Sequence, residues 1–448
     1  MRKVDVAVIG GSAAGIAAAV TCGRHYPDKS ILLITKDRLV PIPCGIPYIF
    51  GTIGDPAKNV MLDAGHKKPG MTILGDEVQE IDRDKRVMTT AGGEEISYER
   101  LILATGSKPI IPPIPGVEKD NVFAVHKNVP HLGKMLERVN ASSRIVVVGG
   151  GFIGVEFADE CKKGRNVKIS IVEMLPKCLM LAFDDELCDV AEEILRKNGI
   201  EILAPDKVVE FVGDDAVTGV RLESGKEIPT DMVILGIGAS ANTELAERAG
   251  LETGPTHGIR VNRYMQTGDK NIFACGDCAE KFSFFDGMPS KLKLASEATR
   301  EARIAGANLF STRRMNRGVI GTFSTVVDGT AFGLAGLSAR GAERKGYDIA
   351  VGEAEAPNRH PGSMPGMAAL RVKLVFERGT GIVIGGQIMG ARSGGELINT
   401  ISTCIHEKMT ADDIALFPMG THPALTASPV MYQLTNAAEM AIKAIRSS

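Results

Sequence analysis

Two glycine-rich turns, each lying between a predicted buried strand and a predicted helix, constrain the fold of this 448-residue chain more than any other feature. The first is Gly10-Gly11-Ser12-Ala13-Ala14-Gly15, which follows the apolar run 4–9 and precedes the small-residue stretch 16–20. Glycines permit a tight turn, and the N–H groups at the start of the helix favour a bound pyrophosphate. The order of strand, turn and helix predicts a dinucleotide-binding α/β unit.

The second turn has the complete glycine spacing. The β-branched run 144–148 leads into Gly149-Gly150-Gly151-Phe152-Ile153-Gly154, and a further predicted strand ends just before Glu173. A carboxylate at that position accepts hydrogen bonds from both hydroxyls of an unphosphorylated ribose, which favours NADH. Because Arg165 and Lys177 lie close in sequence, NADPH remains an alternative.

The first unit departs from this pattern. Its second predicted strand, 31–34, is followed by Thr35 where the ribose-binding carboxylate is expected, and Asp37 comes two residues later. Asp37 is therefore a shifted candidate for the ribose of the first nucleotide.

Two more segments resemble motifs of flavoproteins that bind two dinucleotides. The segment 101–106, which ends in Thr105 and Gly106, is similar to the strand and turn connecting their domains. The segment 271–277, which ends in Gly276 and Asp277, is similar to their late flavin motif, whose aspartate binds the ribityl chain. Together the four motifs resemble the pyridine nucleotide-dependent disulfide reductase family over nearly the whole chain.

The resemblance implies FAD at the first turn and NADH or NADPH at the second. The candidate FAD residues are Gly10, Ser12, Ala13, Ala14, Gly15, Asp37, Thr105, Gly106, Gly276 and Asp277. The candidate NAD(P)H residues are Gly149, Gly151, Phe152, Ile153, Gly154 and Glu173, with Glu156 near the nicotinamide as in the family.

The family fold is α/β, with two Rossmann-like dinucleotide-binding domains similar to those of glutathione reductase and an α+β C-terminal dimerisation domain. A chain of 448 residues is too long for one core, which agrees with several domains. We expect residues 1–118 and 252–323 to form the FAD-binding domain, 119–251 the NAD(P)H-binding domain and 324–448 the dimerisation domain. A homodimer is expected from the last of these.

Composition excludes other classes of function. A net charge of −2 provides no basic surface for nucleic acid, and no apolar run has the length of a membrane span. Asp5 interrupts the only stretch that resembles a signal peptide. Eight scattered cysteines favour a reducing, cytoplasmic setting, and Cys275 and Cys278 lack the second ligand pair that a zinc site needs, so no metal is expected.

Cys44, in Pro41-Ile42-Pro43-Cys44-Gly45-Ile46-Pro47-Tyr48, is the predicted redox centre. Two-cysteine members of the family carry CxxxxC here, but the position five residues after Cys44 is Ile49. The chain thus resembles the single-cysteine branch of NADH oxidases, NADH peroxidases, coenzyme A disulfide reductases and coenzyme A persulfide reductases. A helix predicted to begin at Cys44 would favour its thiolate. The alternative is a buried structural thiol.

Two features bear on the substrate. The oxidases and peroxidases carry a histidine in the first turn, where this chain has Ala13, which favours sulfur over oxygen or peroxide as the acceptor. The coenzyme A-linked members hold adenosine phosphates with basic side chains near the first helix. Arg24, His25 and Lys29 lie at comparable positions, unless they form only a solvated surface.

The predicted acid partner of Cys44 comes from the C-terminal segment. His422 resembles the His-Pro histidine of classical disulfide reductases, although their glutamate partner is replaced by Ala427 or Ser428. Tyr432 resembles the active-site tyrosine of coenzyme A disulfide reductases. The expected function is FAD-dependent NAD(P)H reduction of a low-molecular-weight persulfide, polysulfide or disulfide carried by coenzyme A. The alternatives are an NADH oxidase or peroxidase and a flavoprotein reductase that acts without sulfur chemistry.

Overall fold

The computed structural model describes residues 1–61 and 71–446. The chain folds as two compact units. Unit 1 contains Met1–Pro113, Phe123–Ser142 and Ile237–Val319, and unit 2 contains Ile114–Val122, Ser143–Gly236 and Ile320–Ser448. Among the helices of the described ranges, none has the length and apolar character required to span a membrane.

Unit 1 is built on a seven-stranded sheet with the order β3-β2-β1-β6-β5-β4, and β17 pairs with β6. The central strand β1 (Arg2–Ile9) runs parallel to β2 (Ile31–Thr35) and β6 (Glu95–Leu103), and β17 (Ile272–Ala274) is parallel to β6. The other strands are β3 (Met71–Gly75), β4 (Val78–Asp82) and β5 (Val87–Thr90). Continuous runs of Val, Ile and Leu form the parallel strands because both of their faces are buried.

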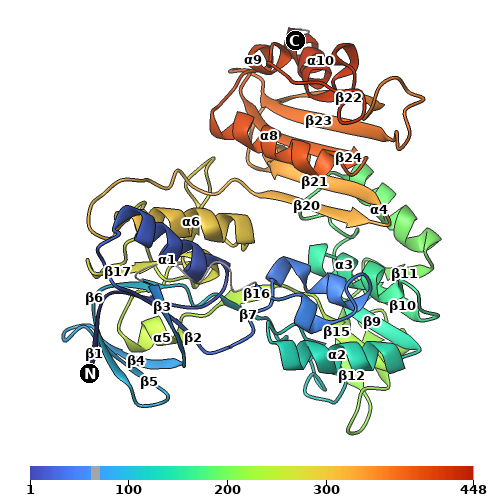
Figure 1. Ribbon diagram of the computed structural model, residues 1–448. Helices are drawn as coiled ribbons and strands as arrows, with labels where there is room; N and C mark the ends of the chain where they lie inside the picture. Colours follow the sequence, from blue (N-terminus) through green and yellow to red (C-terminus); the bar gives the residue numbers. More distant parts are fainter. Residues whose placement is uncertain (62–70, 447–448) are drawn as a thin grey trace. The chain divides into compact units, whose positions relative to one another are not determined.

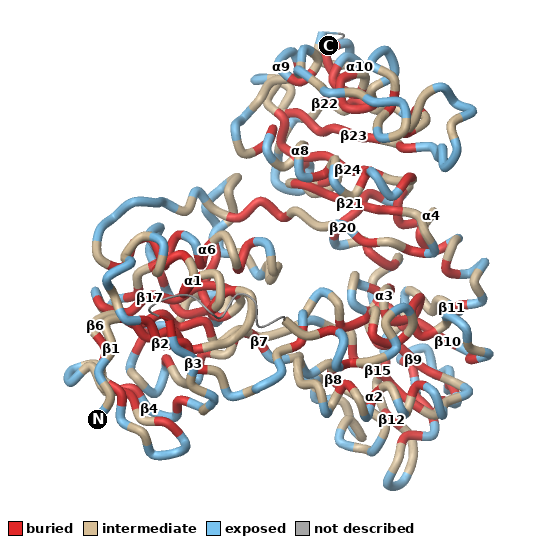
Figure 2. Tube along the Cα trace, viewed as in Figure 1, coloured by how far each residue is buried: buried red, intermediate tan, exposed pale blue. Residues whose placement is uncertain are grey.

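Helices α1 (Ala13–His25) and α6 (Ala295–Asn308) lie together against this sheet (Figure 1). Their close approach depends on Gly306, where a Cβ would come within 2.6 Å of the Ala18 carbonyl oxygen. The strands and the facing sides of both helices form the buried core of unit 1 (Figure 2).

Helix α2 (Val129–Ala141) also belongs to unit 1, where it contacts the short 3-10 helices η2 (Pro47–Phe50) and η3 (Pro56–Lys58). The predicted NAD(P)H-binding domain, residues 119–251, includes this helix, and the predicted domain bounds stay a prediction. The short elements of unit 1 are η1 (Pro43–Gly45), β7 (Ser107–Pro109), β16 (Ala239–Ala241), α5 (Glu244–Arg248), η5 (Gly276–Cys278), β18 (Lys281–Phe282) and β19 (Pro289–Ser290).

The first part of unit 2 is a second parallel sheet, in the order β11-β10-β9-β15-β8. Its glycine turn lies between β9 (Arg144–Val148) and α3 (Phe152–Lys162). The other elements are β10 (Lys168–Val172), α4 (Asp185–Lys197), β11 (Ile200–Leu203) and β15 (Met232–Leu235), with a small antiparallel sheet of β12 (Val208–Val212), β13 (Gly219–Leu222) and β14 (Glu227–Pro229). Strand β8 (Val122–Ala124) pairs into the parallel sheet, but only its first residue belongs to unit 2 in the division of the chain.

The second part of unit 2 is an antiparallel sheet in the order β20-β21-β24-β23-β22. Helix α8 (Gly394–His406) packs on β21 and β24, and α10 (Gln433–Arg446) packs on β22 and β23 (Figure 1). The remaining elements are β20 (Thr322–Val327), β21 (Thr330–Gly336), α7 (Ala339–Arg344), β22 (Ile349–Pro357), β23 (Ala369–Glu377), β24 (Val383–Gly390), α9 (Ala411–Ala415) and η6 (Pro429–Met431).

Candidate functional site

The first glycine turn has the tight geometry that the sequence predicts. Gly10 adopts a positive φ of 119°, and a Cβ on Gly15 would lie 1.7 Å from the Gly10 carbonyl oxygen. Ser12 is the N-cap of α1 but its side chain makes no capping hydrogen bond, and Ala13 is the first helical residue. The helix N-terminus therefore offers backbone N–H groups to an anion without a competing carboxylate in its first turn.

The late flavin motif meets this turn in space. Because β17 pairs with β6, and β6 with β1, all three strands end at the same edge of the sheet. Gly276, with φ of 80°, packs so closely on Ala14 that a Cβ at Gly276 would lie 2.8 Å from the Ala14 Cβ. Gly106 also has a positive φ, and the space before it is open. The motifs thus converge at the carboxyl edge, where parallel α/β sheets bind ligands.

Asp277 is held by two residues that the motifs did not reveal. Its Oδ2 accepts a hydrogen bond from the Ser107 hydroxyl (2.7 Å) and lies 3.3 Å from the Lys127 ammonium. Burial alone would raise the pKa of Asp277, but the charge of Lys127 and the Ser107 hydrogen bond hold it below the ordinary value. Asp277 is thus an ionised acceptor. Thr105, in contrast, uses its hydroxyl to bond the Asn242 carbonyl (2.6 Å).

Thr35, the last residue of β2, occupies the position beside the first glycine turn. A Cβ on Gly11 would lie 2.4 Å from the Thr35 hydroxyl oxygen. Asp37 lies two residues further on and is half-buried, and its Oδ1 is 3.3 Å from the Asn128 amide nitrogen. Asp37 therefore lies in the same unit as the flavin motifs, and its ribose contact stays a prediction.

The second glycine turn repeats this geometry in unit 2. Gly149 has a φ of 102°, and a Cβ on Gly154 would approach the Gly149 carbonyl oxygen to 1.9 Å. The space in front of Gly151 is open, so a phosphate could approach its backbone closely. Phe152 begins α3, and the Ile153 side chain is 41% exposed beside the turn.

Glu173 follows β10 and is buried. Its Oε2 accepts the Gly150 N–H (2.6 Å) and its Oε1 accepts the Leu175 N–H (2.7 Å). The carboxylate is therefore fixed beside the glycine turn, which is the position from which a ribose hydroxyl would be recognised.

Glu156 lies one helical turn after Phe152. Burial raises its pKa to about 7, an effect that the nearby charge of Glu160 increases and the Thr325 hydrogen bond opposes. The Thr325 hydroxyl donates to Glu156 Oε1 over 2.7 Å. This carboxyl group therefore changes its charge near neutral pH.

Cys44 lies in the 3-10 helix η1 and is exposed, whereas the other seven cysteines are buried. The helix expected at Cys44 is a 3-10 helix of only three residues, Pro43–Gly45, and not a longer helix. Pro47 has no N–H to continue an α-helical hydrogen-bond pattern, so the chain forms η1 and then η2. The alternative of a buried structural thiol is contradicted by the exposure of Cys44. Ile49, at the position of the missing second thiol, is 0% exposed.

Other cysteines have environments that suppress reactivity. Burial raises the pKa of Cys22 and of Cys161 to about 12, and it raises the pKa of Cys275 and Cys278 as well. Thiols in such surroundings are poor nucleophiles.

Arg24 and His25 lie at the C-terminal end of α1, beside two arginines that the sequence did not single out. Partial burial and the charges of Arg314 and Arg313 lower the pKa of His25. The buried Asn308 fixes the loop, because its Oδ1 accepts the N–H groups of Arg313 and Arg314, both at 2.9 Å. The result is a cluster of three basic side chains, His25, Arg313 and Arg314.

Lys29 does not extend this cluster. Its ammonium pairs with Asp5 (3.2 Å) and Glu99 (2.8 Å). The predicted phosphate contact of Lys29 is therefore not supported, because these two carboxylates already neutralise its charge.

His422 and Tyr432 lie in the segment before α10. His422 is exposed, and its Nδ1 accepts the Ala424 N–H (3.2 Å), which leaves Nε2 as the protonated nitrogen of the neutral ring. Tyr432 is half-buried, and burial raises its pKa. Tyr432 is extended between the 3-10 helix η6 and the helix α10.

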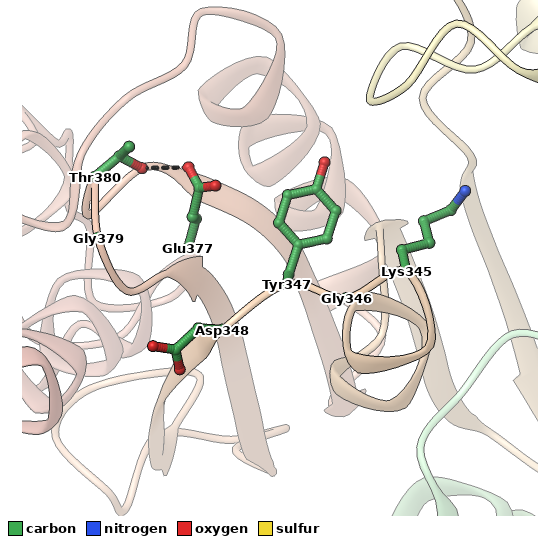
Figure 3. A pocket seen from close by; sticks show the side chains of 7 residues that line it. All are labelled: Lys345, Gly346, Tyr347, Asp348, Glu377, Gly379 and Thr380. Carbon is green, nitrogen blue, oxygen red and sulfur yellow. Dashed lines mark hydrogen bonds between the residues drawn. The ribbon is translucent and has the colours of Figure 1, made fainter.

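A separate cavity of about 410 Å³ lies where α7 ends, near the turn after β23 (Figure 3). Lys345, Tyr347, Asp348, Glu377 and Thr380 are among its lining residues. The Thr380 hydroxyl donates to Glu377 (2.6 Å), as the dashed line in Figure 3 marks. None of the predicted site residues lines this cavity.

The two glycine turns, the Gly276–Asp277 motif and the exposed thiol define a flavoprotein with two dinucleotide sites. The residues fit FAD, because the glycine turn, the open space at Gly106 and the acceptor Asp277 share one sheet edge. Comparison with known families gives the same result. Residues 4–302 match the family of pyridine nucleotide-disulphide oxidoreductases, and residues 322–431 match the dimerisation domain of that family.

The chain belongs to the pyridine nucleotide-disulphide oxidoreductase family. It is 31% identical to an NADH oxidase of Enterococcus faecalis, over 92% of this chain and 94% of the relative. It is 30% identical to an NAD(P)H coenzyme A polysulfide/persulfide reductase of Pyrococcus horikoshii, over 87% of this chain and 88% of the relative. The structure of an NAD-dependent persulfide reductase from A. fulgidus superimposes with a TM-score of 0.89 at 30% identity, covering 98% of this chain and 83% of that one.

These comparisons confirm the predicted fold class of two dinucleotide-binding domains followed by a dimerisation domain. They also confirm that the protein is an oxidoreductase that uses FAD and NAD(P)H, the cofactors of its family.

Proposed function

We propose that this enzyme reduces low-molecular-weight persulfides, polysulfides or disulfides with electrons from NADH or NADPH, and that coenzyme A is the preferred carrier of the sulfur. The exposed Cys44, in the same unit as the flavin motifs and without a second thiol at Ile49, is the observation that carries this proposal. Relatives named for coenzyme A-dependent persulfide or sulfur reduction support it, and so does the similar structure named as an NAD-dependent persulfide reductase.

In this proposal each side chain has a defined task. The turns at Gly10–Gly15 and Gly149–Gly154 hold the two pyrophosphates, and Asp277 accepts a hydroxyl of the flavin side chain. Bound FAD supplies the two-electron relay between the nucleotide and Cys44. Glu173 binds the ribose of the nicotinamide nucleotide, and Glu156 lies one turn from its phosphate site.

The sulfur step is a thiol–disulfide exchange. The Cys44 thiolate attacks the S–S bond of a persulfide, forms a mixed disulfide and releases hydrogen sulfide when the inner sulfur is struck. Two electrons and one proton then restore the Cys44 thiolate and release the carrier thiol. The total is one persulfide, one NADH and one proton converted to one thiol, one hydrogen sulfide and NAD⁺. Attack on the outer sulfur leaves a Cys44 persulfide with the same electron balance.

Two further groups act at this step. The cluster of His25, Arg313 and Arg314, with Arg24 beside His25 in sequence, has the charge required to hold the adenosine phosphates of coenzyme A. His422 is the preferred proton donor, because its exposed ring presents Nε2–H, and Tyr432 is the alternative. His422 or Tyr432 would act from the partner subunit of a homodimer formed through the dimerisation domain.

The second candidate function is oxygen reduction, which the identity to an NADH oxidase favours. The first turn argues against it. Its third and fourth residues are Ser12 and Ala13, so no imidazole stands there to protonate an oxygen intermediate.

The deciding experiment measures anaerobic NADH consumption with coenzyme A persulfide, coenzyme A disulfide, peroxide or no acceptor, and separately with oxygen. Cys44→Ser should lose nearly all turnover with sulfur substrates, whereas Cys22→Ala, which removes a buried thiol, should retain it. Equal sulfur turnover in wild type and Cys44→Ser, or oxygen consumption as fast as persulfide reduction in the wild type, would refute the proposal.

A further inference from the structure

Strand β20, the first strand of the dimerisation part, lies against the helix that follows the second glycine turn. The Phe323 and Phe152 rings are 5.1 Å apart between centroids, and the Thr325 hydroxyl donates to Glu156 Oε1 over 2.7 Å. Side chains two residues apart share a strand face, and side chains four apart share a helix face. The strand therefore holds α3 at two points, one apolar and one polar.

The polar contact is shielded from water. Thr325 is 4% exposed, and Glu156 is half-buried with a pKa raised to about 7 by burial. A hydroxyl that donates to a carboxylate stabilises the charged form, so Thr325 opposes that rise.

Among the described residues, Glu160 on the same helix acts on Glu156 through its charge. Lys163 of α3 pairs with Asp159 (3.3 Å) and Glu160 (2.6 Å). From the β20–β21 turn, the Asp328 backbone donates to Asp159. Phe152, on the same helix, contacts the buried ring of Phe183 from the β10–α4 connection, and Phe183 contacts the buried ring of Phe332 on β21. In this setting Thr325 is the group that directly hydrogen-bonds Glu156.

We propose that Thr325 is a positioning residue for the nicotinamide end of the nucleotide, which orients the Glu156 carboxyl group and sets the pH range in which NAD⁺ binds tightly. The inference rests on the proposed binding of the nucleotide at Gly149–Gly154. An ionised Glu156 attracts the positive nicotinamide ring of NAD⁺, and a protonated Glu156 does not. Removal of the Thr325 hydroxyl makes ionisation harder, so tight binding then requires a higher pH.

The test is the dissociation constant of NAD⁺ for the FAD-loaded enzyme, measured by calorimetry between pH 5.5 and 8.5. Wild type should bind roughly fivefold more weakly below the Glu156 transition than above it, because one charge attraction is lost. Thr325→Val should move the midpoint of this change upward by about one pH unit, the typical effect of one hydrogen bond to a carboxylate. Thr325→Ser should keep the wild-type midpoint.

Three controls separate this effect from general damage. Thr322→Val removes a hydroxyl from the same strand that is 2.8 Å from Ser402 Oγ, and it should leave the midpoint unchanged. Glu156→Gln should abolish the pH dependence, and adding Thr325→Val to it should change nothing further. A wild-type midpoint in Thr325→Val, or an equal shift in Thr322→Val, would overturn the inference.

Binding of NAD⁺ requires neither Cys44 nor a sulfur substrate. If Thr325→Val shifts the pH midpoint of NAD⁺ binding but the enzyme does not reduce persulfides, only the proposed substrate is contradicted. If the wild type does not bind NAD⁺, both proposals are contradicted.

Discussion

The two nucleotide turns differ in the side chain that lies beside each of them, which is Thr35 in unit 1 and Glu173 in unit 2. Strand pairing puts these residues at equivalent positions, since Thr35 ends β2, Glu173 follows β10, and each of these strands runs parallel to the strand before its glycine turn. A Cβ on Gly11 would touch the Thr35 side chain at 2.4 Å, and a Cβ on Gly150 would touch the Glu173 side chain at 3.1 Å. Only the second turn therefore carries a carboxylate where a ribose is recognised.

We expect Glu173→Gln to weaken NADH binding about tenfold, because charge-assisted hydrogen bonds to ribose hydroxyls are lost. The amide oxygen still accepts the Gly150 N–H, so the turn should keep its shape. The dissociation constant of NADPH should change less, because the substitution also removes the carboxylate that repels the 2′-phosphate. The ratio of the two dissociation constants measures this, with Glu201→Gln on β11 as control. An unchanged ratio in Glu173→Gln would contradict the assignment.

Sequence patterns revealed the residues whose role is local and missed those that act across the fold. The glycines and Glu173 stand at fixed distances from predicted strands, so their positions were predictable. Lys127 is 150 positions from Asp277, and Thr325 is 169 positions from Glu156. Such contacts arise from tertiary packing, which the periodicity of apolar residues in the sequence does not predict.

The element that presents Cys44 is a 3-10 turn held by Asn59. Its amide nitrogen donates to the Ile42 carbonyl (2.9 Å), and Ile42 N–H donates to the Asn59 carbonyl (3.0 Å). Gly45 leaves room for this buried side chain, because a Cβ there would lie 2.0 Å from Asn59 Oδ1. Asn59, which lies outside the 3-10 turn, therefore helps to position the Cys44 thiol.

Asn59→Ala should lower the free energy of unfolding by about 1 kcal/mol, the usual net contribution of one hydrogen bond, because the Ile42 carbonyl keeps the bond that it accepts from the Gly45 N–H. Sulfur turnover should fall while NADH-dependent reduction of ferricyanide is retained, because the nucleotide turns are untouched. Denaturant unfolding and both assays check this. Asn436→Ala, which loses an exposed bond to the Val430 carbonyl, serves as control. Equal losses in the two assays would show that Asn59 supports the fold in general and not the Cys44 turn.

At the scale of the whole molecule, a buried polar network joins the two parts of unit 2. Asp184, at the start of α4, is 2.9 Å from the Lys373 ammonium and accepts a hydrogen bond from Gln387 (2.6 Å). The backbone N–H groups of Ala339 and Arg340 also donate to its carboxylate. This network fixes the nucleotide-binding sheet to the dimerisation sheet inside one unit.

Lys373→Met should destabilise the protein by about 3 kcal/mol, because it leaves the buried Asp184 without its counter-charge. Lys197→Met removes an exposed pair with Glu193 on α4 and should cost less than about 1 kcal/mol. Urea unfolding of both variants measures the difference. Similar free energies of unfolding for the two variants would mean that the buried ion pair contributes no more to stability than the exposed ion pair.

The parallel strands were predictable as apolar runs, because both of their faces are buried. The placement of α2 was not. It follows β8 in sequence but packs in unit 1 against η2 and η3. Likewise, the helix expected at Cys44 is divided into the 3-10 helices η1 and η2, because Pro47 has no N–H to continue an α-helical pattern.

The most direct test of the account is reoxidation of the reduced enzyme in a single turnover. The enzyme is reduced anaerobically with one equivalent of NADH and mixed rapidly with coenzyme A persulfide, while flavin absorbance and released hydrogen sulfide are recorded. Wild type should reoxidise with one hydrogen sulfide per flavin, and Cys44→Ser should be at least about a hundredfold slower because the nucleophile is lost. Reoxidation of Cys44→Ser at the wild-type rate would contradict the central claim that Cys44 carries the sulfur chemistry.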